Sequence, residues 1–299
     1  MKLALGPIPY YWPLGAVLDF YRAVVLTAVD VVYLGETVCS RRHELRLPDW
    51  FDLAHMLSSA GKEVVLSTQA LIESESDLKA LRRIAGNGRF MVEANDMGAV
   101  RLLEGKVPFV AGPHLNVYNP QTLAFLGSLG AQRWVAPVEM PRSALSGMLR
   151  SPPEGMETEV YVHGRLPLAL SARCFTARRF NLQKDDCQFR CLDHPDGLTL
   201  RTRDGQPFLV LNGIQTLSAK VCNLVRELPD MAQLGVNVVR ISPQSAHVVE
   251  IAELFKRVLR NPGEAATVAA QLEGLASEET CNGFWHDSAG IERILPGTL

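Results

Sequence analysis

Eight short apolar segments, several of them rich in β-branched residues, recur along this sequence, and segments of helical periodicity separate most of them. This alternation is typical of βαβ units, in which helices cover a sheet of parallel strands. We predict strands over residues 2–5, 29–34, 63–67, 89–93, 108–111, 133–137, 159–162 and 236–241. We predict helices over residues 14–25, 50–59, 74–84, 97–103, 120–129, 222–234 and 246–260, with Asp49 and Ser74 as N-cap residues.

Eight such units within about 260 residues match the α/β class and a (β/α)8, TIM-barrel-like fold of somewhat irregular period. An open, doubly wound sheet is the alternative with the same local pattern. A chain of 299 residues is long enough for one domain of this kind, so we expect residues 1–299 to form a single barrel-like domain. The polar segment 171–215 interrupts the alternation after the seventh strand. We expect it to be a functional insertion, as long insertions in compact domains usually are.

The charge balance excludes partners that need a strong electrostatic field. The 30 Lys and Arg residues and the 32 Asp and Glu residues give a net charge of −2, so we expect no nucleic acid partner. Pro7, Pro9 and Pro13 interrupt the N-terminal apolar residues before a signal peptide can form. The apolar run 23–34 is much shorter than the ~20 residues that cross a bilayer. We therefore expect a cytoplasmic protein with no membrane span.

Several common catalytic motifs are absent from the sequence. His43 and Glu44 begin the H-E-x-x-H motif of helical zinc hydrolases, but Leu47 occupies the position of the second histidine. The sequence contains no G-x-S-x-G nucleophile elbow, no G-x-x-x-x-G-K-[ST] phosphate loop and no G-x-G-x-x-G dinucleotide turn. The usual signatures of nucleotide-dependent chemistry are therefore missing.

Three of the six cysteines lie within the polar segment, with the spacing C-x12-C-x3-C: Cys174, Cys187 and Cys191. The segment offers little apolar material in which a thiol could be buried, because charged residues surround all three. They are therefore better interpreted as metal ligands than as small buried hydrophobic residues. The opposite interpretation suits Cys222, which lies on the apolar face of a predicted helix.

A tetrahedral zinc site or an iron–sulfur cluster needs a fourth ligand, for which the sequence offers Cys39, Cys222, Cys281 and His194. In a barrel, the loop after the second strand and the loop after the seventh both open on the C-terminal face, where barrel enzymes place their sites. Cys39 lies in the first of these loops, so it is the preferred fourth ligand. The spacing alone leaves zinc and an iron–sulfur cluster as equal alternatives.

Other polar side chains are predicted to face the same mouth of the barrel. The candidates for proton transfer are Glu36, Glu93, His114 and His163. The candidates for binding a substrate carboxylate are Arg173 and Arg178. The simpler alternative is a loop-fixing hydrogen bond for the first group and a solvated surface for the second. Asp96 is better interpreted as a helix N-cap, and Asn116 as a turn residue.

The sequence VHGRLPLALSARCFTAR over residues 162–178 resembles the collagenase-like peptidase family, and most closely its members that take part in ubiquinone biosynthesis. The segments LGP over residues 5–7, YLGETVCS over 33–40 and NGFWH over 282–286 are similar to the same proteins. The resemblance thus covers nearly the whole chain.

One departure from the wider family bears on the cofactor. Members usually have a cysteine three residues after the His-Gly pair and another seven residues later, whereas in this sequence Pro167 replaces the first and Cys174 retains the second. In the ubiquinone-biosynthesis members an early cysteine, which matches Cys39, replaces the missing ligand. The resemblance therefore implies that a [4Fe–4S] cluster is bound by Cys39, Cys174, Cys187 and Cys191.

The resemblance also implies an activity and partners. Such proteins act as the iron–sulfur subunit of an oxygen-independent hydroxylase that modifies the aromatic ring of ubiquinone precursors. They work as a heterodimer with a related UbiU-like subunit, a UbiT-like lipid carrier presents the isoprenoid intermediate, and prephenate is the suggested hydroxyl source. A zinc-stabilised, peptidase-like hydrolase and a non-catalytic scaffold are the alternatives.

Overall fold

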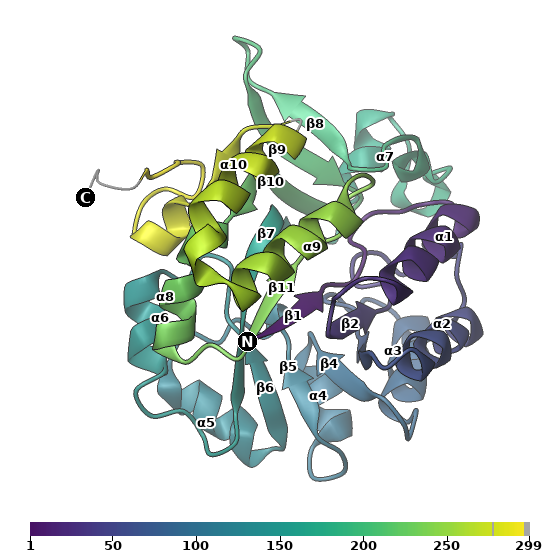
Figure 1. The fold of residues 1–299 in the computed structure, drawn as a ribbon. Helices are drawn as coiled ribbons and strands as arrows, with labels where there is room; N and C mark the ends of the chain where they lie inside the picture. The colour runs from purple at the N-terminus through teal and green to yellow at the C-terminus, as the bar shows by residue number, and fades with distance from the viewer. Residues whose placement is uncertain (277, 296–299) are drawn as a thin grey trace.

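In the computed structural model, which describes residues 1–276 and 278–295, eight parallel strands close into a barrel (Figure 1). The barrel strands are β1 (Lys2–Leu5), β2 (Val31–Leu34), β3 (Glu63–Ser67), β4 (Met91–Ala94), β5 (Phe109–Ala111), β6 (Ala131–Val135), β7 (Glu157–Leu170) and β11 (Val238–Ile241). β11 pairs in parallel with both β1 and β7, and these two pairings close the sheet. The predicted barrel is therefore confirmed, and the open, doubly wound alternative is wrong.

Helices surround this barrel. They are α1 (Leu14–Val25), α2 (Leu47–Ser59), α3 (Glu75–Ala85), α4 (Met97–Leu103), α5 (Pro120–Ser128), α6 (Arg142–Met148), α8 (Leu228–Leu234), α9 (Val248–Arg260) and α10 (Ala265–Leu275). Short 3-10 turns are η1 (Pro113–Leu115), η4 (Val225–Glu227), η5 (Pro262–Glu264) and η6 (Gly283–His286). Within the described residues, none of the helices combines the length and the apolar character needed to span a bilayer.

The helix caps follow the predicted chemistry, with one correction. The Ser74 side chain accepts a hydrogen bond from the backbone N–H of Asp77, and the Asp77 carboxylate accepts one from Ser74 in return. Asp49 is not an N-cap, because Pro48 suits the first helical turn and the helix begins earlier, at Leu47. The Asp49 carboxylate instead accepts a 2.7 Å hydrogen bond from the N–H of Arg46, which holds the cap position.

The helix predicted over residues 222–234 is wrong in its first half. Residues Gln215–Asn223 form strand β10, Val225–Glu227 form the 3-10 turn η4, and only Leu228–Leu234 are α-helical. The reason is the length of β7, which continues past the barrel to Leu170 and offers an unpaired edge. β10 pairs antiparallel with this edge, from Gln215 opposite Leu170 to Asn223 opposite His163. A long-range partner thus overrides the local helical pattern.

Two further strands extend this antiparallel sheet, β9 (Pro207–Asn212) and β8 (Leu198–Arg201), and their hairpin projects away from the barrel in Figure 1. The short strand β12 (Thr280–Cys281) pairs with the other end of β10. The chain between β7 and β8 contains helix α7 (Phe175–Arg179) and the turns η2 (Lys184–Asp186) and η3 (Arg190–Asp193). Because Gln215 pairs with Leu170, the whole segment 171–214, with its cysteines and the β8–β9 hairpin, begins and ends at one place in the sheet.

The core has two parts. Outward-facing strand residues such as Val32, Leu34 and Val92 pack against the helices. Inward-facing residues fill the barrel with a small apolar set that consists of Ala4, Val31, Tyr33, Val65, Val110, Val135 and Val238. Charged side chains share this interior and are buried there in ion pairs, as the cost of desolvating a charge requires.

Candidate functional site

The four cysteines predicted as ligands come from two separate parts of the chain. Cys39 lies in the loop after β2, whereas Cys174 caps α7, Cys187 follows η2 and Cys191 lies in η3. All four are partly buried and free of disulfides. The thiol of Cys174 interacts electrostatically with those of Cys39 and Cys191, and Cys191 also interacts with Cys187. The fold therefore links the four thiols through pairwise electrostatic interactions, although the sequence separates them by up to 152 positions, from 39 to 191.

Four cysteine thiols are the donor set that a [4Fe–4S] cluster uses. In the part of the chain that the structure describes, no three His, Cys, Asp or Glu side chains converge closely enough to hold one metal ion. A [4Fe–4S] cluster takes one thiolate on each of four irons at the corners of a cube, so its ligands stand apart from one another. Burial raises the pKa of the Cys39 thiol to about 11 and also raises that of Cys191, so a cluster bound here would have to displace these protons.

The loop that carries Cys39 is held by Glu36. One carboxylate oxygen of Glu36 accepts hydrogen bonds from the backbone N–H groups of Val38, at 2.9 Å, and Cys39, at 3.0 Å. Burial raises the pKa of this carboxyl group, and the nearby Arg42 guanidinium, 3.6 Å away, opposes that effect. Glu36 was predicted to transfer protons. In the structure its carboxylate holds the loop that carries Cys39.

The turn between Cys187 and Cys191 has an uncommon backbone. Gln188 and Phe189 both adopt left-handed conformations, with φ of 50° and 51°, which non-glycine residues rarely do. Two such residues in succession cost of order 1–3 kcal/mol each, and such conformations concentrate at functional sites. The Phe189 ring packs against Tyr11 and His43, at centroid distances of 5.9 Å and 6.4 Å, and so fastens the turn to the N-terminal loops.

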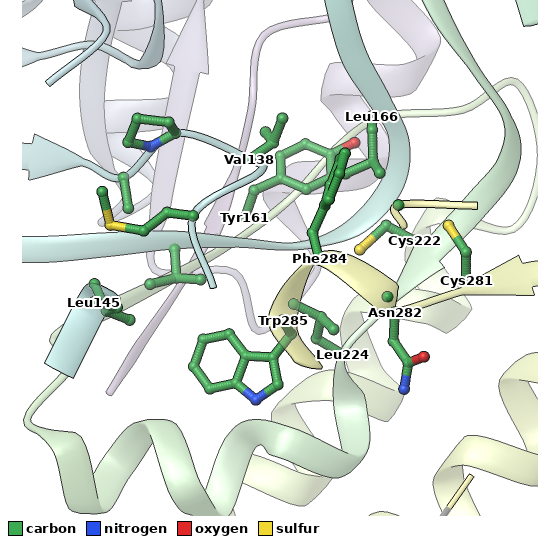
Figure 2. A pocket seen from close by; sticks show the side chains of 16 residues that line it. Val138, Leu145, Tyr161, Leu166, Cys222, Leu224, Cys281, Asn282, Phe284 and Trp285 are labelled. Atoms are coloured by element: carbon green, nitrogen blue, oxygen red, sulfur yellow. The ribbon is translucent and has the colours of Figure 1, made fainter. Parts of the chain in front are cut away.

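The other candidate ligands lie on β10, on β12 and at the end of η3. Cys222 and Cys281 are both buried and occupy paired positions on β10 and β12, where they interact with each other. Figure 2 shows them in a small apolar pocket with Phe284 and Trp285. His194 stacks on Phe180 at 6.0 Å, and its buried Nε2 has no hydrogen-bond partner among the described residues.

A cavity of about 570 Å³ opens at the mouth of the barrel. This volume lies within the range of 300–1,000 Å³ that is typical of small-molecule sites. One side is apolar and includes Val138, Leu168 and Leu170, whereas polar groups come from His114, Asn116, Glu139 and Gln215. A narrower recess shares His114 and Gln215 with this cavity and reaches Tyr161, Arg165 and Arg240. The mouth can therefore enclose an amphipathic molecule with its polar end toward the barrel.

Buried charges form the floor of this recess. Arg240 makes ion pairs with Glu93, at 2.8 Å, and with Glu159, at 2.5 Å, and its guanidinium lies 3.8 Å from the centre of the Tyr33 ring. The Tyr33 hydroxyl donates a 2.5 Å hydrogen bond to Glu159. Burial lowers the pKa of His114, so the imidazole above this floor is neutral near pH 7. Glu93 and His114 are thus brought together as predicted, with a buried arginine between the carboxylates.

His163, the fourth predicted proton-transfer residue, does not face the mouth. A bulge in β7 leaves Val162 unpaired, so that Tyr161 pairs with Arg240 and His163 pairs with the next residue of β11, Ile241. The extra residue turns His163 outward. Its ring packs against Phe255 of α9 at 5.5 Å and is 4% exposed. The prediction that His163 lines the site is therefore wrong.

The predicted carboxylate-binding residues Arg173 and Arg178 are exposed on either side of the Cys174 cap. The buried cation at the thiols is instead Arg42, which the sequence analysis missed. Its position three residues after Cys39 was the available signal. Arg240 and Glu159 were not predicted either, although a charged residue within the apolar run Val-Val-Arg-Ile is itself an indication of a buried ion pair.

Comparison with known proteins identifies the family. The structure of the U32 peptidase Mk0906 is 12% identical, with a TM-score of 0.46 and matches over 82% of this chain and 93% of that chain. The C-terminal domain of a protein provisionally assigned as a chitinase, from Desulfitobacterium hafniense DCB-2, is 11% identical, with a TM-score of 0.30 and matches over 85% and 97%. The family model of peptidase family U32 matches residues 18–294. The chain therefore belongs to peptidase family U32, in agreement with the collagenase-like peptidase resemblance of its sequence.

Proposed function

We propose that this chain is a UbiV-like iron–sulfur subunit of an oxygen-independent hydroxylase that acts on the aromatic ring of ubiquinone precursors. The observation that carries the proposal is the gathering of four free thiols, from two distant loops, beside the mouth of the barrel. Thiolates are the ligands of iron–sulfur clusters, and six cysteines without a disulfide suit the reducing cytoplasm.

The residues of the mouth suit such a substrate. Leu168, Leu170 and Val138 can hold an aromatic ring or the start of its isoprenoid tail, while His114 and Gln215 face its polar substituents. Neutral His114 is suited to accept a proton at its imidazole nitrogen, and the buried Glu93 carboxylate beneath it stabilises the resulting positive charge, which Arg240 opposes. When bound, a [4Fe–4S] cluster would supply one-electron redox chemistry at the same face.

The proposal includes partners. We assign to the chain a homologous UbiU-like subunit as heterodimer partner and a UbiT-like carrier that delivers the lipid-soluble precursor. Prephenate is the proposed hydroxyl donor. Delivery by a carrier is consistent with a chain whose described helices include none long and apolar enough for a membrane.

The experiment is an anaerobic assay of the co-purified subunits with a ubiquinone precursor and prephenate, with the product identified by mass spectrometry. We expect hydroxylated product from the wild-type chain, none from Cys39→Ala, and near-normal amounts from Cys222→Ala, which removes a thiol outside the cluster site. The competing function is peptide hydrolysis, which the family name suggests. Cleavage of peptides by the isolated chain, undiminished in Cys39→Ala, together with no hydroxylation, would overturn the proposal.

A further inference from the structure

Arg42 is the most deeply buried cation beside the cysteines. Its side chain is 2% exposed. One guanidinium nitrogen donates to the backbone oxygen of Pro9 at 2.8 Å, and the other terminal nitrogen donates to the Asn212 side-chain oxygen at 2.7 Å. The Tyr11 ring covers the group, with its centre 5.6 Å from the guanidinium carbon. Arg42 is therefore fixed from several sides and keeps one orientation.

The guanidinium lies near the thiols. The backbone N–H of Arg42 donates to the Cys39 carbonyl oxygen at 3.1 Å, and Tyr11, whose ring covers the guanidinium, packs against Phe189 in the turn between Cys187 and Cys191. The guanidinium interacts electrostatically with Cys39 and Cys191, and its buried Nε atom has no hydrogen-bond partner in the described residues. The nearest carboxylate, Glu36, lies 3.6 Å away, and its negative charge is shared with two backbone N–H donors. The positive charge of Arg42 is therefore available to the sulfur atoms.

A fixed buried charge at this place has a definite consequence. A cluster held by four thiolates is an anion in its oxidised form and gains a further negative charge on reduction. A nearby cation favours the more negative form. This effect is strong here because burial removes the solvent that would otherwise screen it.

The same residue also connects the thiols with the cavity at the barrel mouth. The Asn212 side chain, which accepts from Arg42, donates through its own amide to the Gln215 side-chain oxygen at 3.2 Å. Gln215 lines the cavity. The guanidinium thus lies between the cysteine site and the place where a substrate would bind.

We propose that Arg42 is a positioning residue that raises the reduction potential of the cluster bound by Cys39, Cys174, Cys187 and Cys191, and that Asn212 holds it in place. This inference rests on the proposed function, because it needs the cluster to be present. It goes further in assigning the control of its potential to one buried side chain.

Arg41 provides a matched control on the same loop. It is also an arginine, but its side chain is 36% exposed and it is paired with Asp185 at 3.2 Å. Solvent and this carboxylate screen its charge. Replacing Arg41 by Gln removes the same formal charge as the replacement of Arg42 but should change the potential much less.

The experiment is a redox titration of the anaerobically purified holoprotein, followed by its visible absorption and electron paramagnetic resonance spectra. In Arg42→Gln we expect the reduced-to-oxidised ratio at a fixed potential to fall at least tenfold, equivalent to a midpoint about 59 mV lower. Arg42→Lys should retain most of the wild-type potential, and Arg41→Gln should lie near the wild type. Equal midpoints for Arg42→Gln and Arg41→Gln would overturn the inference.

Iron and acid-labile sulfide are measured on every sample, which separates the two proposals. A wild-type chain without iron and sulfide refutes the proposed function itself and removes the basis of this inference. A loaded wild type whose midpoint is insensitive to Arg42 refutes only the role of Arg42. If Arg42→Gln does not hold a cluster, Asn212→Leu replaces it in the titration. Asn212→Leu keeps the positive charge of Arg42 but removes the hydrogen bond that fixes its guanidinium. A lowered midpoint potential in this variant supports the inference, whereas an unchanged midpoint overturns it.

Discussion

Replacing His163 by Leu should alter how the stability of the chain depends on pH. His163 is 4% exposed, and its buried Nδ1 has no hydrogen-bond partner in the described part of the chain. A protonated imidazole there would be a buried, unpaired charge, and burial accordingly lowers the pKa of His163 to about 4. Leu has a similar volume, no charge and no polar atom, so it keeps the contact with Phe255.

The direction and the size of this pH dependence follow from the pKa values of His163 in the unfolded and the folded chain. The unfolded chain binds the proton near the ordinary value of 6.5, whereas the folded chain binds it only near 4. The contribution of neutral His163 to the free energy of unfolding is therefore fully present above pH 6.5. It declines as the pH falls and is absent below pH 4. The total is about 3 kcal/mol, and the part lost between pH 7 and pH 5 is about 2 kcal/mol.

The assay is urea unfolding of the wild type and His163→Leu at several pH values from 7 to 5. We expect the variant's stability relative to the wild type to increase by about 2 kcal/mol over this range. Effects of other titrating groups act on both chains and cancel in the difference. Parallel pH profiles for the wild type and His163→Leu would refute the reasoning.

Three further predictions concern the barrel and its helices. Gly164→Ala should destabilise the fold by about 2 kcal/mol. Gly164 has φ of +122°, and an added Cβ would lie 2.5 Å from the Tyr161 hydroxyl and 2.6 Å from the Ser242 Cβ. An unchanged melting temperature would show that the backbone accommodates the added Cβ without strain. Glu159→Gln should cost about 3 kcal/mol in chemical denaturation, since it leaves Arg240 without one of its two buried carboxylates; a loss below about 1 kcal/mol would mean that the interior charges are solvated. Ser74→Ala should lower the free energy of unfolding by about 1 kcal/mol through loss of the α3 cap, and Ser74→Asp should restore it; equal losses in both variants would exclude capping as the cause.

Local sequence signals predicted those elements whose structure depends on local chemistry. Strands β1 and β3 and helices α1 and α4 have the predicted bounds to the residue. In these segments the apolar period and the end residues agree with the tertiary environment, so nothing overrides them. The Asp96 side chain caps α4 by accepting from Gly98, and Asn116 adopts the left-handed conformation of a turn residue.

The failures share a different cause, which is dependence on partners far along the chain. Cys222 lies on a strand because the backbone hydrogen-bonding groups of β7 beyond the barrel pair with β10. His163 faces outward because one unpaired residue changes the register of β7 against β11, and no local pattern encodes that register. The burial of Arg42 could be predicted only by knowing which loops contact the Cys39 loop in the folded chain. The strand-end position of Glu93 and His114 was readable from the sequence, whereas the ion pair with Arg240 beneath them was not.

The central claim is that Cys39, Cys174, Cys187 and Cys191 together bind a [4Fe–4S] cluster. The most direct test is the iron and acid-labile sulfide content of the anaerobically purified chain, with zinc measured in the same samples. We predict about four iron and four sulfide per wild-type chain, a marked loss in Cys39→Ala, and wild-type content in Cys222→Ala. Zinc without sulfide, or iron and sulfide that are unaffected by Cys39→Ala, would contradict the account.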